Sequence, residues 1–598
     1  MVSALGPPVL PPNLGMLLHQ VVPPERWCMT RADLKQFRNT VAHAAAHGEL
    51  TPTAQDAFDS SDMRLGPSIR TVCAQFIKPT TARAGNMSWA LMLHPDGLEC
   101  DLFVSHCWDE GIYEFIDKVL LSWPRSARHV YCCMLSNPQN LDIGSLLSTP
   151  RFSPFARALM RADYVLVVPN ERCSIYTRIW CIYEAFLAYE SNKLIYTAMT
   201  PISRFWPRIL WIVILWALGV CLSGVAIVVL PKSSCELVDT MFVVGALVPC
   251  GVAVLCRDLN KVRIANRVGA MAFGFVGGLF GTGWSELPSI LGLKREPICF
   301  LVSSWCCGMA FAASEADVLW GEAARLESDQ LRLGYTGCLE DAHASVPQDK
   351  ADILQEIDSL GLKSEVEHAV EVLMRAGMST PRLRRVTRHG VDVYGAGMWS
   401  AMPLMLLGCT VILEPLENIF TKDICIGIWW WAPFLFLSMG CAGFVLFLLQ
   451  GPDQKGFAAA VAGKCACFTY LAVILVGACG GSRMLPTSVS QCGLDIVGAV
   501  FVGPLVLIMM LIGLEGFAAI PTLGPAIVRL VLPGDGGCLH SMSGWFALAA
   551  HADDSSDPED SASPVPKSLT CIRLAETWVG AIDGTVRHSV SRSRRGLS

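Results

Sequence analysis

The chain has 598 residues, of which 52% are hydrophobic and only 16% are charged, and its formal net charge at pH 7 is −6. Soluble proteins carry about 25% charged residues, so this composition excludes an ordinary soluble protein of this length. The small negative charge gives no indication of nucleic-acid binding. We expect about three or four structural units, part of them in a membrane.

The first region, residues 1–97, opens with a proline-rich segment that predicts partial disorder. This segment lacks the basic stretch that is typical of a secretory signal. We therefore expect the 25 cysteines to be reduced thiols that pack as small apolar groups. A helix is predicted near 31–47, because Thr30 is suited to cap its first turn and Gly48 to end its last.

Short apolar runs alternate with helical patterns between residues 98 and 200. The apolar runs are 100–106, 129–135 and 162–170, and the helical patterns are 111–122, 153–161 and 174–190. This alternation predicts a doubly wound α/β fold with a buried parallel sheet. Ligands bind at the carboxyl ends of such strands. The polar residues expected at that edge are Ser105, His106, Cys107, Trp108, Ser136, Asn137, Asn170, Glu171 and Arg172.

Cys132 and Cys133 are neighbours in the second apolar run. Neighbouring residues of a strand point to opposite faces of the sheet, so we expect the two thiols to point apart. The chain also has no paired C-x-x-C motifs in this region. We therefore predict no metal site among these cysteines and His106.

Two motifs stand in order in this region. They are CDLFVSHCWDE at 100–110 and TRIWCIYEAFLA at 177–188, with the apolar run ADYVLVVPN at 162–170 between them. In this respect residues 98–200 resemble a Toll/interleukin-1 receptor (TIR) domain, whose first strand carries a D-x-F-x-S motif and whose later helix carries W-C-x-x-E.

The TIR resemblance implies a flavodoxin-like α/β fold and two alternative functions. Some TIR domains cleave NAD at the nicotinamide–ribose bond, with the glutamate of W-C-x-x-E as the essential residue; here that position is Glu184. Ser105, Trp108 and Trp180 are then the expected substrate-binding residues. Other TIR domains are non-catalytic scaffolds that bind one another, and this alternative stays open. NAD would be a substrate, so no cofactor is expected.

A series of long apolar stretches begins after residue 205. They lie at 209–230, 238–256, 268–291, 297–314, 397–415, 424–449, 461–481 and 493–514. Most reach the length of about 20 residues that a membrane-spanning helix needs. We predict an all-α transmembrane bundle of about eight helices, four in 205–314 and four in 396–534, the latter followed by an interfacial segment. In the third stretch, Gly274 and Gly278 form a G-x-x-x-G pattern that permits close helix contact.

Basic residues set the predicted orientation of the bundle. Loops on one side carry Arg204, Arg208, Arg257, Lys261, Arg263, Arg267, Lys455 and Lys464, whereas those on the other carry only Lys232, Lys294, Arg295, Lys422 and Arg483. This difference favours a multi-pass protein whose TIR-like domain and both termini are cytosolic. A transporter or channel with a regulatory TIR-like domain is a further alternative.

Two more cytosolic regions are predicted. Residues 315–395 form a helical insert, in which the capping box SEVE at 364–367 opens a helix and Gly377 closes it. The insert ends in a basic run of Arg382, Arg384, Arg385 and Arg388, for which we expect contact with lipid headgroups or, alternatively, with the first domain. The tail at 535–598 is acidic, then basic, and predicted to be partly disordered.

Overall fold

The computed structural model describes residues 14–391, apart from short gaps, and a few residues beyond. The gaps are 143, 148, 173, 232–244, 246–247, 250, 254–255, 257, 283–296 and 345, and the residues described beyond 391 are 393, 396, 515–516, 518–521 and 524. The strands are β1 (Met29–Thr30), β2 (Leu102–Ser105), β3 (His129–Cys132), β4 (Tyr164–Val167), β5 (Leu194–Thr197) and β6 (Met378–Ser379).

The helices fall into three groups along the chain. Before residue 200 they are α1 (Leu14–Val21), η1 (Pro24–Arg26), α2 (Arg31–Ala46), α3 (Ile69–Val72), η2 (Cys73–Ile77), α4 (Lys78–Arg83), α5 (Trp89–Leu93), α6 (Ile112–Ser122), α7 (Cys133–Ser136), α8 (Gly144–Leu147), η3 (Pro150–Phe152), α9 (Pro154–Arg161), η4 (Ile175–Thr177) and α10 (Ile179–Glu190). The long apolar helices are α11 (Phe205–Val229), α13 (Leu259–Gly281) and α15 (Pro297–Arg332). The last group is η6 (Leu339–Asp341), α16 (Pro347–Ser359), α17 (Lys363–Ala376) and α18 (Pro381–Arg388).

The strands form one six-stranded sheet in the order β1-β3-β2-β4-β5-β6. The four inner strands are parallel, whereas β1 and β6 pair antiparallel at the two edges. The α/β prediction is confirmed, but the expectation of a purely parallel sheet is wrong. The two edge strands come from segments outside 98–200, and they cover strand edges that would otherwise expose unpaired backbone groups.

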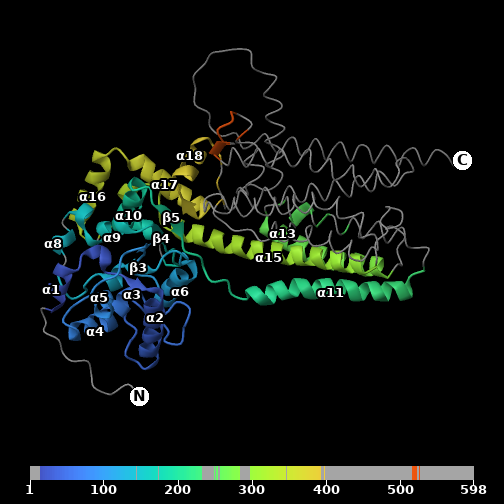
Figure 1. Ribbon diagram of the computed structural model, residues 1–598, viewed down its shortest axis with the longest axis horizontal. Coiled ribbons are helices and arrows are strands. Elements are labelled where there is room, and N and C mark those ends of the chain that lie inside the picture. The colour runs from blue at the N-terminus through green and yellow to red at the C-terminus, as the bar shows by residue number, and fades with distance from the viewer. Residues whose placement is uncertain are drawn as a thin grey trace, which may run out of the picture. The chain divides into compact units, whose positions relative to one another are not determined.

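Helices cover both faces of the sheet, as Figure 1 shows. Alternate residues of the inner strands belong to two separate cores. Phe103 and Val165 face the core that contains α9 and α10. Leu102 and Leu166 face the core that contains α2 and α6. This two-sided burial explains why the central strands are apolar without interruption.

The predicted helix near 31–47 is confirmed as α2. Thr30 accepts a hydrogen bond at its hydroxyl from the backbone N–H of Asp33, and the Asp33 carboxylate accepts one from the backbone N–H of Thr30, which forms a complete capping box. The capping box predicted at 364–367 is wrong, because α17 already begins at Lys363 and no side chain caps it. Gly377 ends α17 in the left-handed conformation, as predicted.

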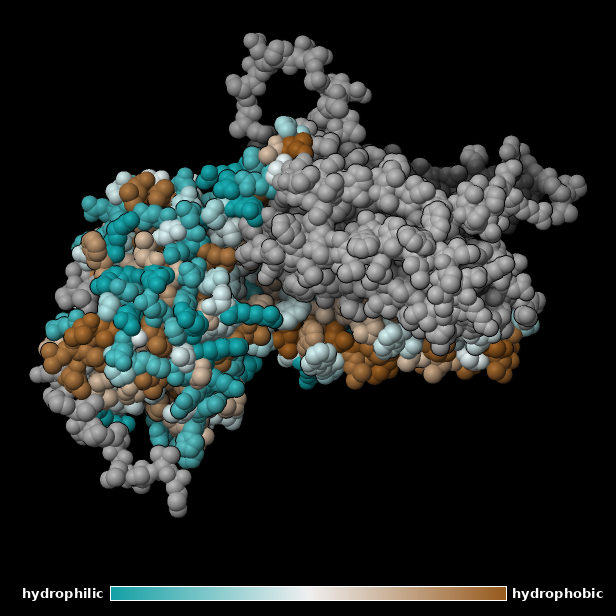
Figure 2. All heavy atoms as spheres, in the orientation of Figure 1, coloured by the Kyte–Doolittle hydropathy of each residue, from teal (hydrophilic) through white to brown (hydrophobic). Residues whose placement is uncertain are grey.

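Among the described helices, α11 and α13 are long and apolar enough to cross a membrane. They correspond to the predicted spans 209–230 and 268–291, although α13 begins at Leu259 and ends at Gly281. Large apolar side chains of α11, including Trp211, Leu218 and Val225, are exposed. Figure 2 shows the apolar surface along this helix, as expected for a face in contact with lipid. The predicted spans after residue 396 and the whole tail lie outside the described residues. The same is true of the predicted interfacial segment, apart from a few positions.

Glycines allow α11 and α13 to pack closely, as the G-x-x-x-G pattern predicts. A methyl group at Gly274 would overlap the carbonyl oxygen of Trp216, and one at Gly278 would overlap the Ser223 hydroxyl. Both partners lie on α11. The pattern therefore serves contact between helices of the same chain.

The fourth predicted span, 297–314, is the first half of the 36-residue helix α15. The helix does not end at Ser314, because α13 provides polar partners for the residues that follow. Asn266 donates a hydrogen bond to Glu315 at 3.1 Å, and Arg263 pairs with Glu322. The C-terminal part of α15 then reaches the α/β domain, where Gln330 accepts a hydrogen bond from the buried Lys118 on α6 at 3.2 Å.

The helices that follow α15 pack against α10. Val366, Val370 and Leu373 of α17 lie in the same core as Ile182 and Phe186 of α10. Strand β6 follows α17 directly and extends the sheet beside β5. Residues 347–379 therefore complete the α/β domain.

The basic run at 382–388 lies on α18. The Arg384 side chain is buried, and its guanidinium packs 4.4 Å from the ring centre of Tyr189 on α10. Arg385 pairs with Glu515 at 2.8 Å. Both contacts occur within the protein, and the first connects α18 with α10.

Candidate functional site

A hydrogen bond joins the two sequence motifs at 100–110 and 177–188. Ser105, the last residue of β2, donates its hydroxyl to Oε2 of Glu184 on α10. Side chains alternate along β2, and Ser105 follows Phe103 on the face that α10 covers. The fold therefore brings together a hydroxyl and a carboxylate that are 79 positions apart in the sequence, at the carboxyl end of the sheet.

Burial controls the charge of Glu184, which is only 8% exposed. Burial raises the pKa of Glu184 to about 7, while the Ser105 hydrogen bond and the nearby His106 and Arg178 oppose this rise. The carboxyl group therefore holds its proton to a higher pH than an exposed glutamate does. Its second oxygen, Oε1, has no hydrogen-bond partner among the described residues, so it can accept a hydrogen bond from a ligand.

The two tryptophans predicted at the site have different surroundings. Trp108 is partly buried in the loop after β2, with its ring centre 6.4 Å from that of His106. Trp180 packs against Phe155, and its indole N–H donates to Asp349 of α16 at 3.0 Å. The structure thus joins Ser105 to Glu184 directly, whereas Trp180 contacts Phe155 of α9 and Asp349 of α16.

A second polar cluster lies at the same edge of the sheet. The His106 imidazole has its Nε2 3.0 Å from the Cys133 sulfur and its Nδ1 3.2 Å from Oε1 of Glu110. Glu110 is not among the residues that the sequence motifs predict at this edge. The i, i+4 spacing of His106 and Glu110 within HCWDE is the signal that would have found it.

The two adjacent cysteines do not point apart as predicted. The sulfur atoms of Cys132 and Cys133 lie 3.9 and 3.0 Å from the same nitrogen of His106. The strand ends at Cys132 and helix α7 begins at Cys133, so the alternation of a strand no longer applies. Across the described ranges, no group of three metal-ligating side chains has the geometry to hold an ion.

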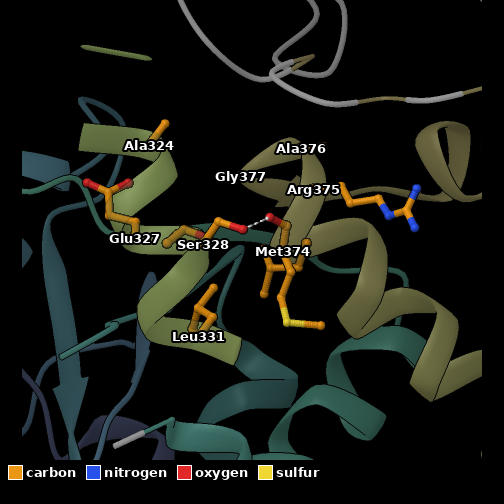
Figure 3. A pocket seen from close by; sticks show the side chains of 10 residues that line it. Ala324, Glu327, Ser328, Leu331, Met374, Arg375, Ala376 and Gly377 are labelled. Carbon is orange, nitrogen blue, oxygen red and sulfur yellow. Dashed lines mark hydrogen bonds between the residues drawn. The ribbon is translucent and has the colours of Figure 1, made fainter. Parts of the chain in front are cut away.

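A small cavity of about 30 Å³ lies apart from both clusters, between α15, α17 and β5. Figure 3 shows its lining, including Glu327 and a hydrogen bond of 2.7 Å from the Ser328 hydroxyl to the Met374 carbonyl. This volume suits about one water molecule. It is too small for a nucleotide.

Comparison with known proteins gives no relative for this chain: no protein-family model matches it, and neither does a curated protein or a solved structure. The site therefore has to be interpreted from its own geometry.

Proposed function

We propose that the chain is a membrane-anchored, TIR-like signalling protein that cleaves NAD at the nicotinamide–ribose bond, with Glu184 as the essential carboxylate. The observation that carries this proposal is the contact between Ser105 and Glu184 at the carboxyl end of β2. It brings the D-x-F-x-S and W-C-x-x-E motifs into one site, which is where α/β sheets bind nucleotides.

The order of the parallel strands supports a flavodoxin-like domain. In chain order these strands are β2, β3, β4 and β5, and in the sheet they stand as β3-β2-β4-β5. A flavodoxin-like sheet begins with the same 2-1-3-4 order. At the fifth position this chain has the antiparallel strand β6.

The chemistry of the bond suits a single carboxylate. Departure of nicotinamide leaves positive charge on the ribose, as in the oxocarbenium-like transition state of glycoside cleavage. The ionised Glu184 stabilises this charge, and its unpartnered Oε1 accepts a hydrogen bond from a ribose hydroxyl. Nicotinamide departs as a neutral molecule, so no general acid is required. Ser105 holds Oε2 and thereby orients the carboxylate.

The proposed anchoring follows from α11 and α13, which are long and apolar enough to span a membrane. Arg263 on α13 pairs with Glu322 on α15, and Lys118 of the α/β domain binds Gln330 further along α15. These contacts support an arrangement in which the α/β domain and the basic end of α13 lie on the same side of the membrane. By the distribution of basic residues, that side is the cytosol in a multi-pass arrangement.

The test is nicotinamide release from NAD by the full-length protein in lipid nanodiscs, because residues far outside 98–200 complete the domain. We expect Glu184→Gln to lower the rate at least about 100-fold. Glu190→Gln is the matched control, since Glu190 ends the same helix and pairs with Arg151 near the surface. Equal rates for wild type and Glu184→Gln at high protein density would refute the catalytic assignment.

The low exposure of Glu184, 8%, favours a second candidate, a non-catalytic scaffold that binds other TIR-like domains. The loop after β2 presents the exposed Asp109 for such contacts, next to the partly buried Trp108. A scaffold predicts concentration-dependent self-association without nicotinamide release. Asp109→Arg would weaken that association, whereas a protein that stays monomeric at every concentration would contradict the scaffold.

A further inference from the structure

A thiol, an imidazole and a carboxylate are in contact in the second cluster. His106 lies between Cys133, 3.0 Å from Nε2, and Glu110, 3.2 Å from Nδ1. The side chains of His106 and Glu110 are each 1% exposed, whereas Cys133 is only partly buried. A nucleophile, a base and a group that orients the base are the parts of an activated thiol.

Glu110 is held firmly in this arrangement. Its Oε1 accepts a hydrogen bond from the backbone N–H of Cys107 at 3.1 Å as well as facing His106. Its Oε2 is buried and has no hydrogen-bond partner within the part of the chain that the structure describes. A buried acceptor without a partner favours a small hydrogen-bonding ligand at the cluster.

This cluster lies beside the Ser105–Glu184 pair. The His106 ring packs 4.9 Å from the ring of Phe115 on α6, whereas Cys133 packs against the core that contains α10. The reaction inferred below uses neither Ser105 nor Glu184, so it does not depend on NAD cleavage.

Charged and titratable groups surround His106 on several elements. Burial alone would lower the pKa of His106, but Cys133 and then Cys132 hold it well above its usual value. Burial raises the pKa of Glu110 to about 7, against the effect of His106. From α10, Glu184 adds negative charge and the Cys181 thiol donates to the His106 carbonyl. A protonated imidazole 3.0 Å from the Cys133 sulfur is the kind of neighbour that activates a thiol.

We propose that Cys133 is a redox-active thiol that hydrogen peroxide or another small hydroperoxide oxidises to a sulfenic acid, with His106 as the proton donor and Glu110 as its positioning residue. The Cys133 thiolate attacks one peroxide oxygen, so that an S–O bond forms and the O–O bond breaks. His106 transfers its proton to the departing hydroxide. Cysteine is oxidised, peroxide is reduced, and the products are Cys133–SOH, water and neutral His106.

The partial burial of Cys133 selects a small oxidant. Its sulfur lies beside a nearly inaccessible imidazole, and its carbonyl accepts a hydrogen bond from Gln139 at 3.3 Å. A peptide or acyl substrate would need a larger opening next to the sulfur. Hydrogen peroxide is about the size of two water molecules, and it adds only one oxygen atom to the sulfur.

The test uses the wild-type full-length protein in detergent, treated with hydrogen peroxide in the presence of dimedone, which traps sulfenic acids. Peptide mass spectrometry then gives the rate at each cysteine. We expect Cys133 to be labelled at least about tenfold faster than Cys338, which is exposed and serves as the control thiol. Lowering the pH from 7 to 6 should slow labelling at Cys338 more than at Cys133, because only Cys133 lies beside His106.

Variants identify the groups that activate the thiol. Cys132→Ser keeps the labelling of Cys133, whereas His106→Gln lowers it at least about tenfold without changing Cys338. Glu110→Gln makes the rate at Cys133 fall more steeply with decreasing pH, an effect that a purely structural role would not produce. Two results with the wild-type protein would overturn the proposal, whether or not the variants fold. One is labelling of Cys133 that is no faster than labelling of Cys338, and the other is labelling of Cys132 that is faster than labelling of Cys133.

Discussion

Ser105 Oγ donates to Glu184 Oε2 and so links the end of β2 to the middle of α10. This hydrogen bond fixes the orientation of Oε2, whereas Oε1 remains available to a ligand. The surrounding core removes water from it, which raises the pKa of Glu184 to about 7. The ionisation of Glu184 therefore affects the stability of the domain as well as any reaction at the site.

Glu184 should make the folded protein less stable as pH rises. Its pKa is about 7 in the folded protein against a usual value of 4.5, so the folded state binds more protons between these values. Stability then decreases from pH 4.5 to pH 7, by at most about 3 kcal/mol from this group. Glu184→Gln removes the ionisation while keeping an acceptor for Ser105.

The measurement compares the unfolding midpoints of wild type and Glu184→Gln at pH 5 and pH 8. We expect the variant to gain stability relative to wild type at pH 8. Glu110 has a similar pKa of about 7, but it remains in both proteins and cancels in the comparison. A difference that is the same at both pH values would contradict this account of Glu184.

Ser105→Ala should move the pH dependence of the proposed reaction. The hydrogen bond from Ser105 lowers the pKa of Glu184, so its loss raises that pKa above about 7. Nicotinamide release depends on the ionised carboxylate and should therefore reach half of its maximum at higher pH in the variant. Rate–pH profiles of wild type and Ser105→Ala measure the shift, and a shift to lower pH would show that Ser105 does not stabilise the ionised form.

Much of this domain was predictable because local patterns dictate it. The apolar runs around Phe103 and Val165 are buried on both sides and form central strands. Thr30 caps α2, as its place just before the helix predicts. The position of Glu184 near Ser105 follows from two short motifs and the rule that ligands meet the carboxyl ends of parallel strands.

Other features depend on contacts that no local pattern specifies. Strand β6 has two residues and pairs with β5 across about 180 residues of chain. Helix α15 continues beyond the predicted end of the span, because α13 supplies partners for Glu315 and Glu322. The shared orientation of Cys132 and Cys133 depends on where β3 ends, and strand boundaries are the least predictable part of a sequence.

Lys118→Met should destabilise the protein strongly. Lys118 is fully buried, and its Nζ donates to Glu114 at 2.7 Å, to the Pro169 carbonyl at 2.7 Å and to Gln330 at 3.2 Å. Methionine fills similar space but leaves these acceptors without their cation, at a cost of about 3–5 kcal/mol. The unfolding midpoint should therefore fall well below that of Lys35→Met, an exposed control on α2. Equal midpoints would mean that this contact does not hold α15 to the domain.

Gly274→Ala should weaken the packing of α13 against α11, although alanine normally stabilises a helix by about 0.5–1 kcal/mol relative to glycine. The added methyl group would overlap the carbonyl oxygen of Trp216, so the two helices must separate. At Gly224 on α11, by contrast, a methyl group meets no atom within 4 Å. Thermal unfolding in lipid nanodiscs should show a loss of stability for Gly274→Ala and none for Gly224→Ala. A gain for both variants would mean that the two helices do not touch at Gly274, because only helix propensity would then act.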